Sequence, residues 1–257
     1  MGTIVITGSA GGIGSATRAR LERDGHTVIG VDVRDAEVIA DLSTPAGRDA
    51  MVDGVAKACG GSLDGVVAGA GISNENAPLM VSINYFGAVA TLAGLRPLLA
   101  KGTRASAVAI SSNSTTATLG GVVPEAVDAC LEGDEERACK LVGEGYPGYP
   151  TSKLALARWV RRNAPTADWI GAGIRLNAIA PGPIATPMTE PIKDMVMTMG
   201  DAYPVPIGRL GAADEVANLL AFLVSPEASY IVGSMVFVDG GGDAAARSDD
   251  WPLGRFA

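Results

Sequence analysis

The chain has 257 residues, of which 47% are hydrophobic, and its formal net charge at pH 7 is −8. This length suits a single α/β domain with a well-buried core, and the acidic balance argues against nucleic acid as a partner. No apolar run approaches the roughly 18 residues that a membrane span needs. The first predicted strand starts at Thr3, which leaves no room for a signal peptide. We therefore expect a cytoplasmic protein with no membrane partner.

Metal-dependent chemistry is disfavoured by the scarcity of ligands. His26 is the only histidine, and Cys59, Cys130 and Cys139 show no paired metal spacing. A histidine-rich zinc site is excluded, and a serine hydrolase would have to use His26 itself. Three unpaired cysteines are simplest as reduced thiols of a cytoplasmic protein. We expect no metal.

A glycine-rich turn follows the first predicted strand. Thr3–Thr7 is a short β-branched run typical of a buried strand, Gly8–Gly14 follows at once, and helix formers continue from Ser15. The Gly-x-x-x-Gly-x-Gly spacing lets the backbone approach a pyrophosphate, and the helix N-terminus offers free N–H groups. The turn predicts a nucleotide site, although glycines are common in this chain and could form a turn without a ligand.

The second predicted strand, Thr27–Val31, ends in Asp32. A carboxylate about 20 residues past such glycines accepts hydrogen bonds from the adenosine ribose hydroxyls and repels a 2′-phosphate. NAD is therefore favoured over NADP. Arg34 leaves NADP open, because a nearby arginine can accept a phosphate, and Asp32 could also be only a strand-end turn residue.

Strands and helices continue to alternate along the chain. The further predicted elements are a helix from Pro45, a strand at Gly65–Ala68, a helix near Val81–Leu99, a strand at Ala105–Ser111, a helix at Tyr149–Arg162, a strand at Ile174–Ala180, a helix at Ala213–Leu223 and a strand at Met235–Val238. This order predicts a single-domain Rossmann-type α/β fold, a doubly wound parallel sheet with helices on both faces.

Tyr149 and Lys153 form a Tyr-x-x-x-Lys pair. On a helix, positions i and i+4 lie on one face, so the phenol and the ammonium converge. A free tyrosine titrates near pH 10, and a charge about 4 Å away at an effective dielectric of about 20 is worth roughly 4 kcal/mol. Lys153 is therefore expected to lower the pKa of Tyr149 toward neutrality. The spacing also occurs by chance on surface helices.

Together these motifs resemble the short-chain dehydrogenase/reductase family, from Thr3 to about Gly241. Residues 7–14 look like the family's TGxxxGIG turn. Further resemblance is carried by Asp41-Leu42, Asn84 within Val81–Gly87, Ile110–Ser112, Asn177–Pro183 and Val236–Gly241. The resemblance implies hydride transfer between an alcohol carbon and the nicotinamide of NAD.

The resemblance also implies roles for individual residues. Tyr149 would be the general acid/base, Lys153 would assist it and hold the nicotinamide ribose, Ser112 would bind the substrate oxygen, and Asn84 would anchor a water that relays the proton. Ser111 is the competing serine. The cofactor would be bound by Gly8, Gly12, Ile13, Gly14, Asp32, Asp41, Leu42, Ala70, Gly71, Tyr149, Lys153, Pro181, Gly182, Ile184 and Thr186.

Two departures from the family pattern refine the prediction. Ala68–Gly71 stands where the family usually has Asn-Asn-Ala-Gly, and residues 113–148 make an unusually long stretch between Ser112 and Tyr149. With Arg34–Ser43, this stretch resembles the bacterial 3α-hydroxysteroid dehydrogenase/carbonyl reductase subgroup. A terpenoid or aryl secondary alcohol is the alternative substrate. A non-catalytic NAD-sensing regulator or a halohydrin-type lyase is the alternative from another class. Intact Ser112, Tyr149 and Lys153 argue against the regulator, and the retained lysine and glycine turn argue against the lyase.

The insertion, at about residues 115–146, is expected to be helical. Pro124 can start a helix and Gly133 can break it, with a second apolar face at Ala138, Leu141 and Val142. We expect a flap near the substrate or a subunit interface, with a solvated loop as the alternative. It could obstruct tetramer formation, so we expect a homodimer, with a homotetramer still open. A tail from about residue 243 would be loose or close over a neighbour.

Methionines follow the predicted nicotinamide turn, at Met188, Met195, Met197 and Met199. Methionine suits adaptable apolar pockets, and helix core is an equal alternative. The few charges in this segment favour an apolar alcohol or ketone as the substrate.

Overall fold

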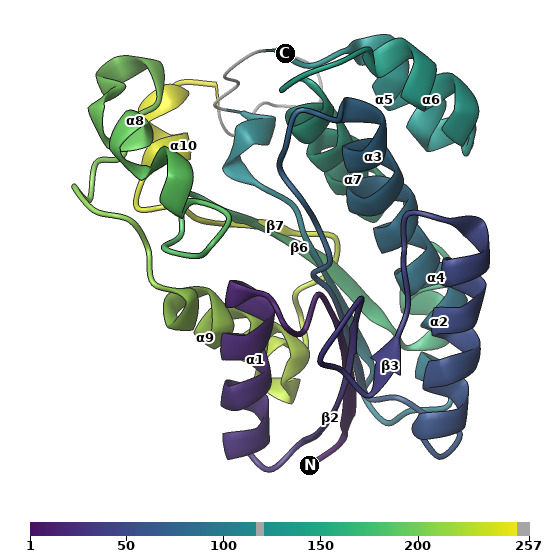
Figure 1. The fold of residues 1–257 in the computed structure, drawn as a ribbon. Helices are drawn as coiled ribbons and strands as arrows, with labels where there is room; N and C mark the ends of the chain where they lie inside the picture. Colours follow the sequence, from purple (N-terminus) through teal and green to yellow (C-terminus); the bar gives the residue numbers. More distant parts are fainter. Residues whose placement is uncertain (117–120, 251–257) are drawn as a thin grey trace.

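The computed structural model describes residues 1–116 and 121–250 and contains a seven-stranded parallel sheet covered by helices on both faces (Figure 1). The strand order is β3-β2-β1-β4-β5-β6-β7. The strands are β1 (Thr3–Thr7), β2 (Thr27–Asp32), β3 (Val38–Ile39), β4 (Gly65–Ala68), β5 (Ser106–Ile110), β6 (Arg175–Pro181) and β7 (Met235–Val238). The predicted doubly wound fold is confirmed. Residues 117–120 of the predicted insertion and 251–257 of the predicted tail lie outside the described residues.

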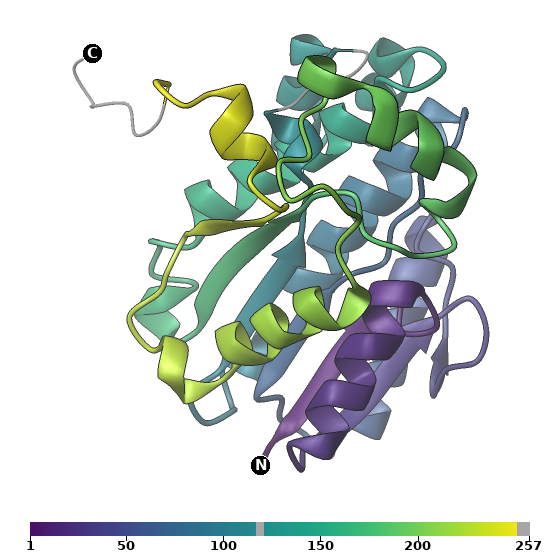
Figure 2. The same ribbon diagram turned by 90° about the vertical axis from the view of Figure 1, so that its left-hand side faces the viewer.

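Two helical layers enclose the sheet. Figures 1 and 2 show α1 (Gly12–Arg23) and α9 (Ala213–Val224) on one face, and α2 (Pro45–Ala58), α4 (Ala88–Leu99) and α7 (Gly148–Asn163) on the other. Successive side chains of β1 alternate between these layers, because Ile4 and Ile6 belong to one core cluster and Val5 to the other. A sheet buried on both faces explains why its strands read as continuous apolar runs.

The strand order reverses between β1 and β4. From β1 the next strands, β2 and β3, extend to one edge of the sheet, and from β4 the strands β5 to β7 extend to the other edge. In open α/β sheets, ligands bind outside the carboxyl ends of the strands at such a point. The fold therefore places a binding cleft beside Thr7, at the end of β1, and Ala68, at the end of β4.

A continuous helix runs from Ala77 to Leu99 and contains a π-helical segment. It comprises α3 (Ala77–Val81), the π-helix η1 (Ser82–Gly87) and α4. The helix has 23 residues and an 18-residue window with a mean hydropathy of 1.4, so by length and composition it could cross a membrane, and half of that window is buried inside the protein. The sequence prediction that no apolar run approaches about 18 residues missed this helix, since it counted uninterrupted apolar residues and not the mean hydropathy of a window.

Two short helices lie in the predicted insertion. Helix α5 (Pro124–Glu132) ends at Gly133, whose φ of 82° is left-handed, and α6 (Glu135–Val142) begins with the Asp134 side chain accepting a hydrogen bond from the backbone of Arg137. Both helices pack into the main core through buried residues: Ala126, Val127, Ala129, Cys130, Ala138 and Val142. Leu141, predicted on this apolar face, is instead 39% exposed.

Small helices gather beyond the carboxyl ends of the strands. They are η2 (Asn113–Thr115), η4 (Glu190–Ile192), α8 (Lys193–Thr198), η5 (Gly200–Ala202) and α10 (Gly242–Ala246); η3 (Ile170–Ala172) and η6 (Pro226–Ala228) complete the helices of the described chain. Met188, Met195 and Met197 are exposed by 44%, 53% and 37%, so they are not helix core. Met199 packs beside Val196 and Tyr203 in a small separate cluster.

Candidate active site

A cleft with a volume of about 460 Å³ opens at the reversal of strand order. Most of the residues predicted to bind the cofactor line it, namely Gly8, Gly12, Ile13, Gly14, Asp32, Asp41, Leu42, Ala70, Gly71 and Thr186. The strand ends, the glycine turn and the segment after β6 therefore meet around one cavity.

The glycine turn has the geometry that a dinucleotide requires. Gly8 has a φ of +74°, and a Cβ at Gly14 would lie 2.0 Å from the carbonyl oxygen of Gly8. A Cβ at Gly12 would lie 2.6 Å from Cγ2 of Thr186, on the opposite wall of the cleft. No side chain caps the N-terminus of α1. The turn thus leaves backbone N–H groups facing a narrow space, which fits a pyrophosphate.

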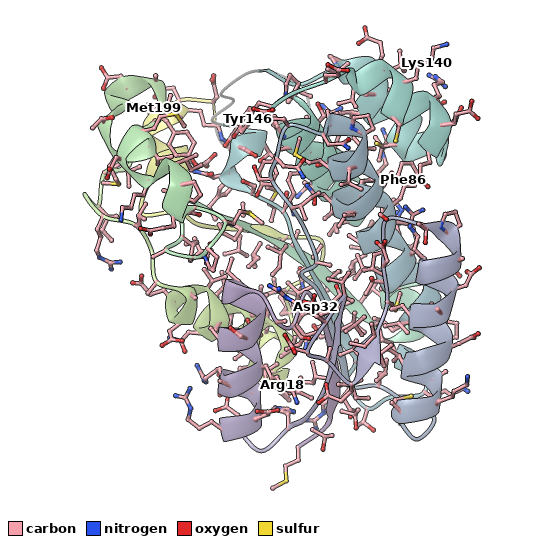
Figure 3. The ribbon with its side chains drawn as sticks, in the orientation of Figure 1. Arg18, Asp32, Phe86, Lys140, Tyr146 and Met199 are labelled. Carbon is pink, nitrogen blue, oxygen red and sulfur yellow. The ribbon has the colours of Figure 1, made fainter. Side chains whose placement is uncertain are left out.

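Asp32 lies at the tip of β2, where Figure 3 labels it. Its Oδ2 accepts a hydrogen bond from the Ala10 backbone at 3.0 Å, and its Oδ1 accepts one from the Val33 backbone at 2.7 Å. Asp32 therefore braces the strand end and the glycine turn while also lining the cleft. Arg34 lines the same cleft and is exposed.

Asp41 and Leu42 form the wall beyond β3. The side-chain hydroxyl and then the backbone N–H of Ser43 hydrogen-bond to Asp41 and lower the pKa of its carboxyl group. Leu42 is 5% exposed, and a Cβ at Gly87 would lie 3.0 Å from that of Leu42. The wall is therefore packed directly against the π-helical segment.

Ser112, Tyr149 and Lys153 come together at the end of β5. Ser112 is the N-cap of η2, where its hydroxyl oxygen accepts a hydrogen bond from the Ser114 backbone at 3.1 Å, and the hydroxyl also acts on Tyr149 in the direction that lowers the pKa of the phenol. On α7, Lys153 Nζ lies 5.7 Å from the centre of the Tyr149 ring. The predicted acid/base pair and the predicted oxygen-binding serine are thus neighbours.

Burial dominates the ionisation of this group. It raises the pKa of Tyr149 to about 12, against the opposing hydrogen bond from Ser112, and it lowers the pKa of Lys153 to about 8. Lys153 is 4% exposed, and its Nζ donates a hydrogen bond to the carbonyl oxygen of Ile110 at 2.9 Å. The expected lowering of the Tyr149 pKa is therefore not found, because desolvation outweighs any attraction from Lys153.

Asn84 is fully buried in η1. Its Oδ1 accepts a hydrogen bond from the Ile72 backbone at 2.8 Å, and its Nδ2 donates to the Ile72 carbonyl oxygen at 3.0 Å. A Cβ at Gly71 would lie 3.1 Å from Asn84 Oδ1 and 3.3 Å from Lys153 Nζ. The absence of a side chain at Gly71 therefore lets Asn84 and Lys153 approach the same point.

Five predicted cofactor residues do not line the cleft: Tyr149 and Lys153, which lie with Ser112, and Pro181, Gly182 and Ile184, which lie in and after β6. Pro181 is buried in β6, and the backbone N–H of Gly182 donates to the Val238 carbonyl oxygen at 3.1 Å. The Ile184 side chain is 5% exposed and packs in the core. The resemblance to the family was carried by the whole segment in and after β6 and did not distinguish its individual residues. Of the four residues predicted there, only Thr186 lines the cleft. The competing serine, Ser111, donates a hydrogen bond to the Lys153 carbonyl oxygen at 2.9 Å, so its hydroxyl is engaged by the backbone of α7.

Two tyrosines beside this group, Tyr146 and Tyr203, were not predicted. The rings of Tyr146 and Tyr149 are 6.4 Å apart, and Tyr203 donates a hydrogen bond to Oδ1 of Asn113 at 2.7 Å. Figure 3 shows Tyr146 and Met199 in the half of the molecule beyond the strand ends. The spacing of Tyr146 and Tyr149 could have suggested their contact, but Tyr203 and Asn113 are 90 positions apart.

Comparison with known proteins agrees with this arrangement. The family description "short chain dehydrogenase" matches residues 2–124, and "Enoyl-(Acyl carrier protein) reductase" matches residues 137–243. The chain is 41% identical to the 3-alpha-hydroxysteroid dehydrogenase/carbonyl reductase of Comamonas testosteroni, over 96% of this chain and 98% of that protein. It is 34% identical to the cis-4-hydroxycyclohexanecarboxylate dehydrogenase of Sinomonas cyclohexanicum, over 92% and 94%.

A solved structure is similar throughout. The 3-alpha-hydroxysteroid dehydrogenase from Pseudomonas sp. B-0831, solved as a complex with NADH, superposes with a TM-score of 0.89 and 43% identity, covering 97% of this chain and 100% of that one. The fold and the cleft define a dinucleotide-binding oxidoreductase. The chain belongs to the short-chain dehydrogenase/reductase family, as its motifs indicated.

Within residues 1–116 and 121–250, no group of three acidic, histidine or cysteine side chains could hold a metal ion.

Proposed function

We propose that this protein is an NAD(H)-dependent oxidoreductase that interconverts a hydrophobic secondary alcohol and its ketone, with 3α-hydroxysteroids and related carbonyl compounds as substrates. The observation that carries the proposal is the group of Ser112, Tyr149 and Lys153, whose lysine approaches Gly71 in the lining of the nucleotide cleft. The similarity to the Comamonas enzyme over nearly the whole chain supports the substrate class.

The cofactor would be held mainly by backbone and by one carboxylate. The glycine turn would receive the pyrophosphate, and Asp32 the adenosine ribose, which favours NAD over NADP. Asp41 and Leu42 would border the adenine, and Thr186 would meet the carboxamide. When bound, the nicotinamide accepts or supplies the hydride.

The protein's own groups would handle the proton and the substrate oxygen. Tyr149 would donate its phenolic proton to the ketone oxygen during reduction and remove the hydroxyl proton during oxidation. Ser112 would hydrogen-bond the same oxygen as charge develops on it. Lys153 would hold the nicotinamide ribose, and Asn84 would anchor the water that carries the proton away.

The proposed substrate mouth is apolar and open. Met188, Met195 and Met197 are exposed, and Tyr146 is 40% exposed beside Tyr149. Such surfaces bind by buried area and adapt to related ring systems. A terpenoid or aryl secondary alcohol is the second candidate, and similarity to a cis-4-hydroxycyclohexanecarboxylate dehydrogenase supports a substrate with a single ring.

The test is a panel of substrates whose oxidation is monitored through the absorbance of the NADH formed. Purified protein is supplied with NAD⁺ and with 3α- and 3β-hydroxysteroids, monocyclic terpene alcohols or 1-phenylethanol, and kcat/KM is compared. We expect a 3α-hydroxysteroid to be oxidised best. Discrimination in an apolar pocket is about 1–3 kcal/mol per methylene, so a terpene or aryl alcohol ahead of every steroid by more than about a hundredfold would reject the steroid assignment. Activity with none of them would favour the regulator or the lyase.

We also propose that residues 1–257 form one NAD-binding domain of a cytoplasmic homodimer, with the insertion at about 115–146 obstructing a tetramer. Helices α5 and α6 support this, since they cover part of the surface of α7 and α3. A sedimentation mass corresponding to a tetramer would contradict the dimer.

A further inference from the structure

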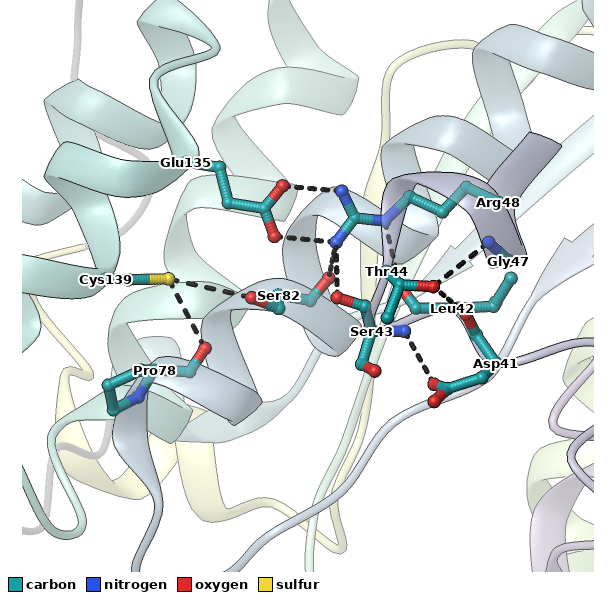
Figure 4. Close-up of polar contacts among 10 residues, drawn as sticks. All are labelled: Asp41, Leu42, Ser43, Thr44, Gly47, Arg48, Pro78, Ser82, Glu135 and Cys139. Carbon is teal, nitrogen blue, oxygen red and sulfur yellow. Dashed lines mark hydrogen bonds and ion pairs between the residues drawn. The ribbon is translucent and has the colours of Figure 1, made fainter.

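An ion pair between a buried arginine and a half-buried glutamate joins the insertion to the nucleotide-binding half of the chain (Figure 4). Arg48, in α2, is 8% exposed, and its guanidinium donates hydrogen bonds of 2.6 and 2.7 Å to the two carboxylate oxygens of Glu135, in α6. An arginine–carboxylate contact through two parallel hydrogen bonds fixes orientation as well as charge. The residues are 87 positions apart, so the pair connects two distant segments.

The same guanidinium holds the wall of the cleft that contains Asp41 and Leu42. Nε of Arg48 donates to the Leu42 carbonyl oxygen at 2.8 Å, and Nη2 donates to the Ser43 carbonyl oxygen at 3.3 Å. The turn is also closed locally, since Thr44 caps α2 by accepting a hydrogen bond from the Gly47 backbone at 3.0 Å. Arg48 therefore fixes the path of the backbone where the cleft receives the adenine.

A third carbonyl brings in the π-helical segment. Nη2 of Arg48 donates to the Ser82 carbonyl oxygen at 3.0 Å, and the guanidinium lies over the Phe86 ring, 5.8 Å from its centre. Leu42 packs against Gly87 in the same segment. One side chain thus links the adenine wall to the helix that carries Asn84.

Glu135 is the charge that keeps this arrangement together. Burial would raise the pKa of its carboxyl group, but hydrogen bonds from Arg48 and Ser82 outweigh burial and lower it, so Glu135 is ionised at neutral pH. A buried guanidinium that lost this partner would face only carbonyl oxygens and would be left with an uncompensated charge. The guanidinium would then shift, and the backbone carbonyls that it contacts would shift with it. Two of these carbonyls, those of Leu42 and Ser43, belong to the wall of the cleft proposed to receive the adenine.

We propose that Glu135 is a positioning residue for the cofactor: by fixing Arg48, it holds the Asp41–Ser43 backbone in the shape that receives the adenine half of NAD(H). The insertion then contributes to cofactor binding from outside the cleft. The inference rests on the proposed binding of NAD(H) in this cleft and goes beyond it by assigning a role to α6.

The experiment compares Glu135→Gln with wild type. The amide keeps the size of the side chain but cannot bind the guanidinium as a charged, two-oxygen acceptor. We expect the Kd for NADH, measured by NADH fluorescence, to rise about tenfold, the size of effect that the loss of a charge-assisted hydrogen bond gives. The inhibition constant of ADP-ribose, which lacks the nicotinamide, should rise by the same factor, while kcat at saturating cofactor changes less than twofold.

The matched control is Glu132→Gln. Glu132 pairs with Arg137 in the same insertion, but both side chains are exposed, by 58% and 46%, so neither constant should change. A lower melting temperature of Glu135→Gln with unchanged constants would show a purely structural role and overturn the inference. If that variant does not fold, Arg48→Lys is measured, because lysine keeps the charge but not the fixed fork of donors; normal NADH binding by it would equally overturn the inference.

Wild-type binding separates this inference from the proposed function. A wild-type protein that does not bind NADH would refute both. A wild type that binds NADH together with a Glu135→Gln variant of equal affinity would refute the positioning role alone.

Discussion

The ammonium of Lys153 donates a hydrogen bond of 2.9 Å to the carbonyl oxygen of Ile110, the last residue of β5. This contact places the lysine at the strand end that continues into Ser112, so that one backbone segment orients two of the proposed catalytic residues. It also explains why Lys153 tolerates burial. Its charged form keeps a strong acceptor, although burial still lowers its pKa to about 8.

The raised pKa of Tyr149 predicts a different pH dependence for each direction of the reaction. Alcohol oxidation needs tyrosinate, and the pKa of Tyr149 is raised to about 12, so kcat/KM for oxidation should rise continuously between about pH 6 and 10. Ketone reduction needs the neutral phenol, which stays protonated over that range, so its kcat/KM should not rise. Initial rates in both directions across this range provide the measurement. A plateau of oxidation near neutral pH would show that Lys153 overcomes the effect of burial.

Removing the phenolic hydroxyl should separate catalysis from cofactor binding. We expect Tyr149→Phe to lower kcat by about 10²–10⁴-fold, the usual contribution of acid/base catalysis, with the Kd for NADH nearly unchanged. Tyr146→Phe is the matched control, because it removes a hydroxyl from the neighbouring ring and should retain most activity. A phenylalanine variant at position 149 that kept more than about a tenth of wild-type kcat would reject this residue as the acid/base.

Cofactor preference is predicted to depend on the charge of Asp32. Wild type should prefer NAD⁺ to NADP⁺ by at least about tenfold in kcat/KM, which corresponds to about 1.4 kcal/mol. Asp32→Asn should narrow this ratio while keeping one acceptor for the Ala10 or Val33 backbone. Asp35→Asn is the control, since Asp35 is exposed in the same loop and asparagine tolerates its φ of 50°. Equal use of both cofactors by wild type would refute the role of Asp32.

Much of this site could be predicted because its parts are local in sequence. The glycine turn lies between β1 and α1, and the Tyr149–Lys153 spacing fits one face of α7, so pattern and geometry coincide. Short continuous apolar runs also predicted six of the seven strands. The exception, β3, has only the residues Val38 and Ile39, which is too short for a periodic signal.

Other features depended on contacts or environments that no local pattern records. The π-helical turn around Asn84 differs from an α-helix by one residue in its hydrogen bonding, which hydrophobic periodicity does not resolve. The Arg48–Glu135 pair joins two helices that are remote in sequence. The direction of the Tyr149 pKa shift was missed because the spacing gave the distance to a charge, whereas burial decided the sign.

The hydrogen bond between Tyr203 and Asn113 is predicted to hold residues 188–203, which contain the four methionines, against η2 at the end of β5. Tyr203 is 9% exposed and packs with Val196 and Met199, and its hydroxyl is the donor to Asn113 Oδ1. Tyr203→Phe would leave that buried oxygen without its donor, so we expect a loss of about 1–3 kcal/mol in the free energy of unfolding measured with urea. The KM for a bulky alcohol should rise, with the Kd for NADH unchanged. Tyr230→Phe, at a fully exposed position, is the control and should alter neither quantity. If Tyr203→Phe lowered stability while KM stayed at the wild-type value, the segment would be packed by this contact but would not shape the substrate site.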